Sequence, residues 1–511
     1  MSWGSDALGV TEDTFDMIKA ATSGINTSTG VAGIHMSDLV SLVPVDTPFF
    51  NSTPRHPAPV GALFAVWQAL LNVNSTQPNG GIQKQQAAPL IEIENQYLYS
   101  NYAVVGAGGT VSWDALAQGQ NYATVLAVDT LQAVNQQLIF LDRHQLNGQS
   151  FKTCATVPTP ALTKHPSGGS IATTITVKVK VAIRSGLNYY YGGSSLPGTV
   201  ATVKTSAATS SVTAKVTAVK TAAAYDWFVS FTTGTVYYYY TTTPWNVVTI
   251  TKKITAAQTI PTTYAGLYKA GGAGPAVPTG TRATFQSYWQ NGLVSSILGD
   301  FSASPDQLGV SGQVANLVAP GTGTAQGSYY SSLTGGALTV SGAAITQIDE
   351  MNRRIYDKYQ LTPTRMLMGS QSINDVADAL LDNPQAVTWL VPTDAQGRAR
   401  MVAGGAVAVY LNKTVNGRPI TIELQPNLPP GKIVSVVDEV PFPGANITTV
   451  LSVETLYDFF RFDYGANRVL TTTTNSGGGP RYDFEVRTSQ AFINKASPVF
   501  GVLDNIAPGL S

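Results

Sequence analysis

One helical pattern, between residues 112 and 148, constrains the fold of this 511-residue chain more than any other feature. Ser112 is a suitable N-cap, Asp114 favours a first helical turn, and Gly148 stands where a glycine ends a helix. An apolar stripe recurs at spacings of four and three residues: Ala127, Leu131, Val134, Leu138 and Leu141. The opposite face is polar with little charge: Gln132, Asn135, Gln136 and Asp142. A helix of about 35 residues is a rod of roughly 50 Å, which is long for a globular domain.

Residues 1–58 are predicted to form an irregular arm. Five prolines exclude a regular helix across its second half: Pro44, Pro48, Pro54, Pro57 and Pro59. We therefore expect the arm to run extended over a neighbouring surface, with little core of its own.

Two strands and the polar stretch between them predict a long β-hairpin. Residues 61–73 are mostly apolar, and residues 74–89 read as the tip. Residues 90–105 alternate, and one face carries Ile91, Ile93, Asn95, Tyr97 and Tyr99. A hairpin of this length is not stable alone, so it needs a partner surface.

From residue 154 to 284 the chain is rich in Thr, Val, Ala and Tyr, which predicts an all-β insertion. Period-two strands are expected within residues 173–183, 211–220, 227–240 and 246–254. Its aromatic residues are Tyr189–Tyr191, Trp227 and Tyr237–Tyr240. These side chains either form an exposed surface for a sugar or a receptor, or pack a sandwich core and line a contact between subunits. Strands are enriched in tyrosine in any case, which favours the second interpretation.

After Phe285 the pattern is that of a mixed α/β unit. A helical face within residues 338–359 carries Ile345, Ile348, Met351, Ile355 and Tyr359. A short strand at 364–370 and a second helix at 371–383 follow, with Ile373, Val376, Ala377 and Leu380 facing inward. Further strands are predicted at 406–411, 419–424, 432–438 and within 449–470.

Composition favours self-association. Charged residues make up only 12% of the chain, and 30 Lys and Arg residues balance 30 Asp and Glu residues. A surface with so little charge and no basic field suits a protein that is covered by its own copies, and it predicts only weak, nonspecific contact with DNA. Cys154 is the sole cysteine, no apolar run is long enough to span a membrane, and the N-terminus does not resemble a signal peptide. We expect a product that is made and left in a cytosol.

Residues able to carry catalysis are sparse. The four histidines, His35, His56, His144 and His165, show no metal-ligand spacing, and Cys154 has no histidine beside it in sequence. The serines of Gly309–Gly312 and of Gly369–Ser372 do not form a nucleophile elbow, and the second segment is better read as a helix N-cap.

Glycine clusters and acidic pairs give no stronger signal. Gly106–Gly109 precedes the predicted helix, but Val111 occupies the place of the last glycine in a dinucleotide fingerprint. The clusters Gly271–Gly274 and Gly321–Gly323 read as turns. A glycosidase would need two carboxyls from separate elements, and the acidic pairs are Glu92 and Glu94, Asp349 and Glu350, and Asp438 and Glu439. Arg353 and Arg354 are too few for a nucleic-acid patch and are expected on a solvated helix face or in a salt bridge. The sequence therefore predicts no enzyme, and no catalytic, cofactor-binding or metal-binding residue.

Four segments resemble the major capsid proteins of tailed bacteriophages with the Hong Kong 97-type fold. The segment VDTPFFNS resembles the end of the family's N-arm, and LDRHQLNGQ resembles the end of its spine helix. FQSYWQNGLVSSI resembles the segment that re-enters the A-domain, and residues 348–380 resemble that domain's helix, strand and helix. The resemblance covers residues 40–150 and 285–465 and rests on the order and spacing of these segments.

The resemblance implies an α+β fold with six parts. These are an N-terminal arm at 1–58, an E-loop β-hairpin at 59–110, a spine helix of the P-domain at 111–153, an all-β insertion domain at 154–284, an A-domain at 285–445, and P-domain strands with the C-terminal segment at 446–511. Lys84 lies near the hairpin tip, where some relatives carry a cross-linking lysine, but no partner asparagine or catalytic acid aligns, and an ordinary solvated lysine is the simpler interpretation.

The function implied is self-assembly into the icosahedral head that encloses a double-stranded DNA genome. The partners implied are other copies in hexamers and pentamers, a portal protein, scaffolding and decoration proteins, and nonspecifically packaged DNA, with no membrane. Scaffolding is expected to be separate or unnecessary, since no long charged helix precedes the arm. The location implied is the virion, after assembly in the bacterial host cytoplasm. The alternatives are a bacterial nanocompartment shell of the same fold, a β-rich phage decoration or adhesin protein, and a carbohydrate-active enzyme.

Overall fold

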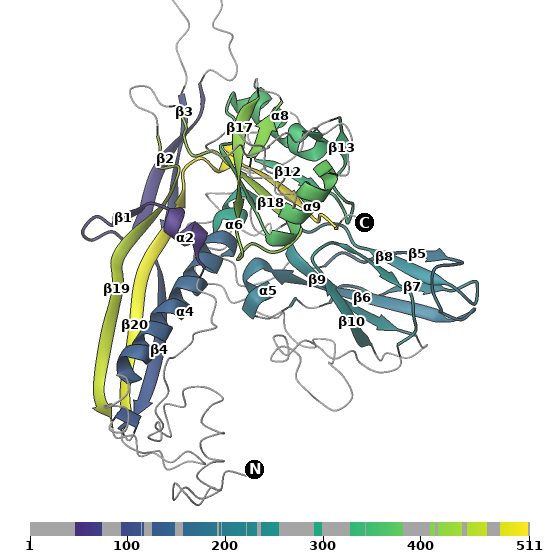
Figure 1. The fold of residues 1–511 in the computed structure, drawn as a ribbon, viewed down its shortest axis with the longest axis horizontal. Coiled ribbons are helices and arrows are strands. Elements are labelled where there is room, and N and C mark those ends of the chain that lie inside the picture. Colours follow the sequence, from purple (N-terminus) through teal and green to yellow (C-terminus); the bar gives the residue numbers. More distant parts are fainter. Residues whose placement is uncertain are drawn as a thin grey trace, which may run out of the picture. The chain divides into compact units, whose positions relative to one another are not determined.

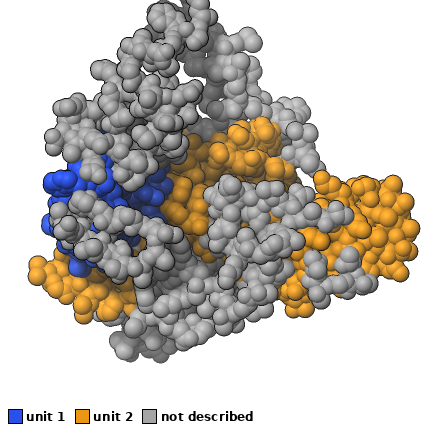
Figure 2. All heavy atoms as spheres, turned by 90° about the horizontal axis from the view of Figure 1, so that it is seen from below, with its two compact units in different colours: residues 1–47, 104–141, 455–490 blue, residues 48–103, 142–454, 491–511 orange. Residues whose placement is uncertain are grey.

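A computed structural model describes most of the chain. The residues described are 46–73, 93–113, 115–116, 125–148, 157–191, 194–195, 197–220, 222–231, 237–254, 291–298, 328–342, 344–381, 409–413, 417–441, 447–467 and 481–508. The chain forms two compact units (Figure 2). Unit 1 comprises residues 1–47, 104–141 and 455–490, and unit 2 comprises residues 48–103, 142–454 and 491–511.

Unit 1 is built on a sheet with the strand order β19-β20-β4, and helix α4 runs along it (Figure 1). The elements are β4 (Ala103–Ser112), α4 (Val125–Asn147), β19 (Leu451–Asn467) and β20 (Arg481–Asn494); β4, α4, β19 and β20 also continue into unit 2. The core between helix and sheet consists of Val111, Ala115, Val125, Ala133, Phe484 and Val486. Helix and sheet thus bury one face of each, as two packed layers do.

The predicted end of the long helix is confirmed, because α4 ends at Asn147 and the Gly148 N–H donates to the His144 carbonyl at 2.7 Å. Ser112 caps a helical turn as predicted, since its Oγ accepts the Ala115 N–H at 3.2 Å. Residues 117–124 and Asp114 lie outside the described residues, so the predicted rod of about 35 residues is described as a helix of 23.

The predicted apolar stripe of this helix is confirmed only in part. Leu141 is buried and Val134 packs against the core between helix and sheet, as predicted. Leu131 is 58% exposed and Ala127 is exposed, however, and Ala133 and Gln137 are buried in their place. The Gln137 side-chain nitrogen donates to the Val486 carbonyl of β20, which gives this buried donor a partner inside the interface. A small residue and a paired amide therefore turn a different face of the helix toward the sheet. Asp142, predicted on the polar outer face, is also buried.

Unit 2 contains a six-stranded sheet with the order β12-β21-β18-β15-β17-β16. Its strands are β12 (Tyr329–Ser332), β15 (Arg365–Met368), β16 (Val409–Asn412), β17 (Arg418–Leu424), β18 (Ile433–Val436) and β21 (Gly501–Asp504). Helices α8 (Thr346–Tyr359) and α9 (Ser370–Leu381) share a core with one face, and α6 (Leu293–Leu298) shares a core with the other. Ile345, Ile348, Met351 and Ile355 are buried there, so the predicted helix–strand–helix is confirmed.

Residues 157–254 of unit 2 form a two-sheet β-sandwich. One sheet has the order β10-β9-β6-β7 and the other β11-β8-β5. The strands are β5 (Ala161–His165), β6 (Thr176–Ser185), β7 (Ala201–Lys204), β8 (Ser211–Lys215), β9 (Ala222–Ser230), β10 (Tyr238–Thr243) and β11 (Val247–Ile250). Their shared core includes Tyr225 and Trp227, with Tyr238 and Tyr240 packed against it, as the core interpretation of the aromatics expects. Tyr189–Tyr191 lie instead in a helix, α5 (Gly186–Tyr191).

The predicted hairpin is present as β2 (Phe64–Val73) and β3 (Ile93–Asn101), paired antiparallel with Phe64 opposite Asn101. The second strand was predicted too long, because the chain leaves the hairpin after Asn101 and joins the unit 1 sheet as β4 from Ala103. Residues 74–92, which comprise the predicted tip with Lys84 and also Ile91 and Glu92, lie outside the described residues.

Short elements complete unit 2. They are α2 (Pro48–Ser52), β1 (Arg55–Pro57), β13 (Val340–Ser341), β14 (Ala344–Ile345) and the 3-10 helix η3 (Ser497–Val499). The arm was predicted to lack helix, yet α2 forms because Pro48 is at its first position, where a proline is tolerated. Phe49 of α2 is fully buried in the core that α6 shares, so this part of the arm does contribute to a core. In the described part of the chain, no helix is both long and apolar enough to cross a membrane.

Candidate functional site

The described histidines do not form a reactive group. His56 and His165 are exposed, and His165 lies 3.1 Å from the Thr213 hydroxyl. His144 is fully buried, and this desolvation lowers its pKa to about 4, which keeps the ring neutral at pH 7. His35 and Cys154 lie outside the described residues. Within the described ranges, no three His, Cys, Asp or Glu side chains gather as a metal site would require.

The acidic pairs have structural partners. The Tyr410 hydroxyl donates to Asp349 at 2.7 Å. Arg353 and Arg354 both bind Glu350 on the exposed face of α8, as predicted, and their hydrogen bonds lower the pKa of Glu350. Asp438 is bound by an arginine, and the side chains of Glu92 and Glu94 are not described. Each of these described carboxylates is therefore held by a hydrogen bond or an ion pair within its own unit.

Gly106–Gly109 lie inside strand β4. A Cβ at Gly109 would stand 2.4 Å from the Phe484 ring and 2.6 Å from the Asp129 carboxylate. The glycine is therefore required for the close approach of β4 to its neighbours, and no phosphate-binding role is needed to explain it.

With no reactive cluster in the described residues, the surfaces that call for explanation are apolar. The first, here called the hairpin face, consists of exposed residues in and before β2: Val60, Leu63, Phe64 and Val66. Val66 is 60% exposed, and Phe64 packs edge-on against Tyr99 of β3 with ring centroids 5.8 Å apart. The alternate residues point the other way, where Ala65 and Trp67 pack with Ala491 and Ile493. One side of the hairpin root is thus covered by its own chain, and the other side is open.

The second surface, here called the β19 strip, lies in unit 1. It consists of Leu456, Phe460, Phe462 and Tyr464, which share one face of β19 because they are separated by even numbers of residues. Phe460 is 55% exposed, and its ring meets Phe462 edge-on with centroids 4.8 Å apart. Arg487 of β20 lies over the Phe462 ring at 5.6 Å, and the Tyr464 hydroxyl donates to Glu485 at 2.8 Å. The strip is an ordered aromatic surface with polar neighbours, which is typical of a protein–protein contact.

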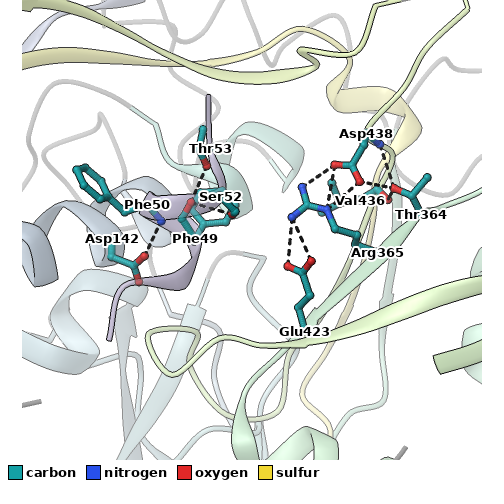
Figure 3. A network of polar contacts seen from close by, with 10 residues as sticks. All are labelled: Phe49, Phe50, Ser52, Thr53, Asp142, Thr364, Arg365, Glu423, Val436 and Asp438. Atoms are coloured by element: carbon teal, nitrogen blue, oxygen red, sulfur yellow. Dashed lines mark hydrogen bonds and ion pairs between the residues drawn. The ribbon is translucent and has the colours of Figure 1, made fainter. Parts of the chain in front are cut away.

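A polar network, here called the anchor network, joins α2 and the loop at Asn427 to the end of α4; Figure 3 shows its hydrogen bond between Phe50 and Asp142. The buried Asp142 carboxylate accepts the Phe50 N–H at 2.8 Å and the Asn427 amide at 2.6 Å. The Arg143 guanidinium donates to Asn427 at 3.0 Å and lies over the Tyr190 ring at 4.5 Å. Charged groups at these distances form stronger hydrogen bonds than neutral ones. The network therefore holds α2, α5 and the loop at Asn427 on the last turns of α4.

Figure 3 also shows an ion triad at one face of the six-stranded sheet. Arg365 of β15 binds Asp438 at 2.5 Å and Glu423 of β17 at 3.1 Å, and the Thr364 hydroxyl donates to Asp438 at 2.7 Å. The arginine is about one-fifth exposed, and the two carboxylates keep its charge balanced. The triad fixes three adjoining strand ends and leaves no carboxylate of its own for chemistry.

Sequence reasoning missed both the anchor network and the β19 strip. Asp142 was assigned to the outer face of its helix, and nothing local marks its pairing with Phe50, which is 92 residues away. The strip did have a local signal, because Leu456, Phe460, Phe462 and Tyr464 alternate with Arg461 and Asp463 in the sequence.

Comparison with known proteins gives remote similarities only. No family model and no curated protein matches the sequence. The structure is similar to the encapsulin SrpI of Synechococcus elongatus PCC 7942, with a TM-score of 0.38 and 7% identity over 96% of this chain and 95% of that one. It is similar to the capsid of a native GTA particle, with a TM-score of 0.42 and 7% identity over 96% and 98%. It is also similar to the capsid of the Myoviridae phage XM1, with a TM-score of 0.40 and 8% identity over 93% and 97%. Similarity at this level does not by itself assign a fold or a function.

Proposed function

We propose that this chain is the structural subunit of a closed protein shell with the Hong Kong 97-type fold, the major capsid protein of a tailed bacteriophage. In this assignment β2 and β3 are the E-loop, and α4 with β4, β19 and β20 forms the P-domain. The six-stranded sheet with α8 and α9 is the A-domain, and the sandwich is an insertion. The segments that resemble the family, quoted above, fall in this order along the chain.

The observation that carries the proposal is the hairpin. Strands β2 and β3, of 10 and 9 residues, form a two-stranded sheet of their own in the described structure. An isolated two-stranded hairpin is at best marginally stable in water, and an exposed apolar face adds to the cost. A second copy that covers the hairpin face would remove that cost, and repetition around a closed lattice would sum many such modest contacts.

The anchor network supports the same function. Because Asp142 and Asn427 hold the segment before β1 in place, the hairpin emerges from a fixed root while one face stays open. A rigid root with an open face suits a subunit that reaches onto its neighbour, since preorganisation lowers the entropy lost on association.

The finer parts of the proposal follow from the family. Copies would form hexamers and pentamers, with a portal protein at one vertex and separate scaffolding or decoration proteins where these are used. The shell would enclose double-stranded DNA, would be found in the virion after assembly in the host cytoplasm, and would have no enzymatic activity.

Electron microscopy and sedimentation of the purified chain test this function. We expect capsomers or closed shells, and Val66→Asp should reduce the yield of shells at least about tenfold, because it places a charge in the centre of the hairpin face. The matched control is Val409→Asp, which changes an exposed valine of β16 and should leave assembly unchanged. A wild-type chain that stays a compact monomer at all concentrations would refute the proposal. Shells that contain a protein cargo and no DNA would indicate a nanocompartment instead.

A further inference from the structure

The charges of this chain are strongly segregated, although they sum to zero. Residues 154–284, which include the sandwich, hold eleven of the thirty Lys and Arg residues and only one of the thirty acidic residues, Asp226. This segment therefore carries a net charge of plus ten, and the rest of the chain carries minus ten. The net charge of zero is therefore the sum of a basic segment, residues 154–284, and an acidic remainder, which is the rest of the chain.

The one acidic residue of the sandwich does not offset its surface charge. Asp226 is fully buried and is bound by Arg184, also fully buried, at 2.8 Å. The Thr242 hydroxyl donates to the same carboxylate at 2.5 Å. The pair neutralises itself inside the sandwich, so Asp226 does not offset the charge of the exposed lysines.

Two lysines of this segment lie over aromatic rings: Lys220 over Tyr330 of β12 at 5.8 Å, and Lys180 over Tyr237 at 4.7 Å. Others are exposed to solvent on different elements of the sandwich: Lys164, Lys204, Lys215, Lys252 and Lys253. Lys215 stands in register with Ala161 and Val247 on the three-stranded sheet, and Lys252 and Lys253 follow the end of β11.

The face of that sheet is polar but otherwise uncharged. A row of threonines crosses its three strands, Thr163, Thr213 and Thr249, and the last two hydroxyls lie 3.4 Å apart. Hydroxyls and lysines make a surface that pairs with carboxylates through charge-assisted hydrogen bonds without burying apolar area.

We propose that the sandwich docks through its exposed lysines onto the acidic remainder of a second copy of this chain. The inference rests on the proposed self-assembly and names a contact within it. Charge complementarity selects this occupant, because every copy carries both partners in equal amount. Contacts of this kind set the specificity and rate of association more than its strength, and they weaken as salt screens them.

A nucleic acid is the competing occupant for a basic surface. It is disfavoured here because an anionic polymer that is attracted to the sandwich is repelled by the remainder of the chain, which is net acidic. With a second copy, the basic sandwich of each copy faces the acidic remainder of the other. We therefore expect the lysines to affect assembly more than DNA binding.

The test uses the full-length double variant Lys252→Glu/Lys253→Glu. We expect a roughly tenfold rise in the subunit concentration needed to form shells in about 0.05 M NaCl, and a much smaller difference from wild type in about 0.5 M NaCl, where screening is strong. The matched control, Lys358→Glu/Lys413→Glu, makes the same charge change at exposed residues of the acidic remainder and should not raise that concentration. Circular dichroism and thermal melting would verify that both variants fold.

Each alternative result has a distinct meaning. A sandwich variant that assembles like wild type at low salt overturns the inference and leaves the proposed shell function intact. A variant that assembles normally but loses binding to a labelled 30-base-pair DNA duplex assigns the lysines to nucleic acid and also overturns it. A wild-type chain that never assembles refutes the proposed function itself.

Discussion

The six-stranded sheet of unit 2 and the β19-β20-β4 sheet of unit 1 bury their surfaces in different ways. The six-stranded sheet shares a core with α8 and α9 on one face and with α6 on the other. The unit 1 strands β19, β20 and β4 belong to a four-stranded sheet that also contains β1; they share a core with α4 on one face and carry the β19 strip exposed on the other. The first sheet completes its core within one chain, whereas the second leaves an apolar face for another molecule. A subunit of a larger assembly needs both a core that is buried within its own chain and an exposed apolar surface that another subunit can cover.

The largest expected effect tests how well the core of the six-stranded sheet excludes water. Lys432 and Asp504 form an ion pair at 2.5 Å, and both side chains are at most 2% exposed. Lys432→Ala leaves the Asp504 charge buried with its partner removed, so the free energy of unfolding should fall by about 4 kcal/mol. Urea unfolding of dissociated subunits measures the change.

Lys432→Met/Asp504→Leu is the matched control, because it removes both charges and keeps much of the volume. It should recover most of the lost stability. A loss below about 1 kcal/mol for Lys432→Ala would mean that water reaches the pair and that this sheet is less closed than the structure indicates.

The next effect is a pH dependence from His144, which is buried in unit 2. Its pKa is lowered from 6.5 to about 4 by desolvation, so unfolded chains take up the proton first. The stability that the neutral ring provides is present above pH 6.5 and is lost as the pH falls toward 4, by about 3 kcal/mol. His144→Gln should remove this dependence, so the difference in unfolding free energy between wild type and variant should change between pH 7 and pH 4. A constant difference across that range would show that the ring is solvated.

The sequence predicted best what local periodicity controls. Helices α8 and α9 and strand β15 follow from apolar residues at helical spacing on either side of a short methionine-rich strand, and they lie where expected. The sandwich strands follow from period-two patterns. Trp227 and Tyr225 are buried because alternate residues of β9 face the second sheet.

Interactions between residues that are far apart in the sequence could not be predicted from local sequence patterns. The pattern of α4 favoured the face of Leu131, but the sheet packs on the face of Ala133 and Gln137, because Gln137 finds a backbone partner on β20. Asp142 with Phe50 and Lys432 with Asp504 pair over 92 and 72 residues. Nothing near either member of a pair in the sequence identifies the other. The charge segregation of residues 154–284 was present in the sequence, but a count over the whole chain averaged it away.

The smallest expected effect on stability is at the β19 strip, and it separates the two kinds of surface most sharply. Phe460→Ser/Phe462→Ser changes exposed rings, so the free energy of unfolding of the dissociated subunit should fall by less than about 1 kcal/mol. Assembly should nevertheless be strongly reduced, since an interface loses aromatic anchors. The matched control is the neighbouring Phe459→Ser, which alters the face that packs with Phe484 and α4 and should destabilise the subunit by about 2 kcal/mol. If the outer double variant destabilised the subunit as much as the inner one, the strip would be part of the core of unit 1, and the contrast between a closed and an open sheet would not hold.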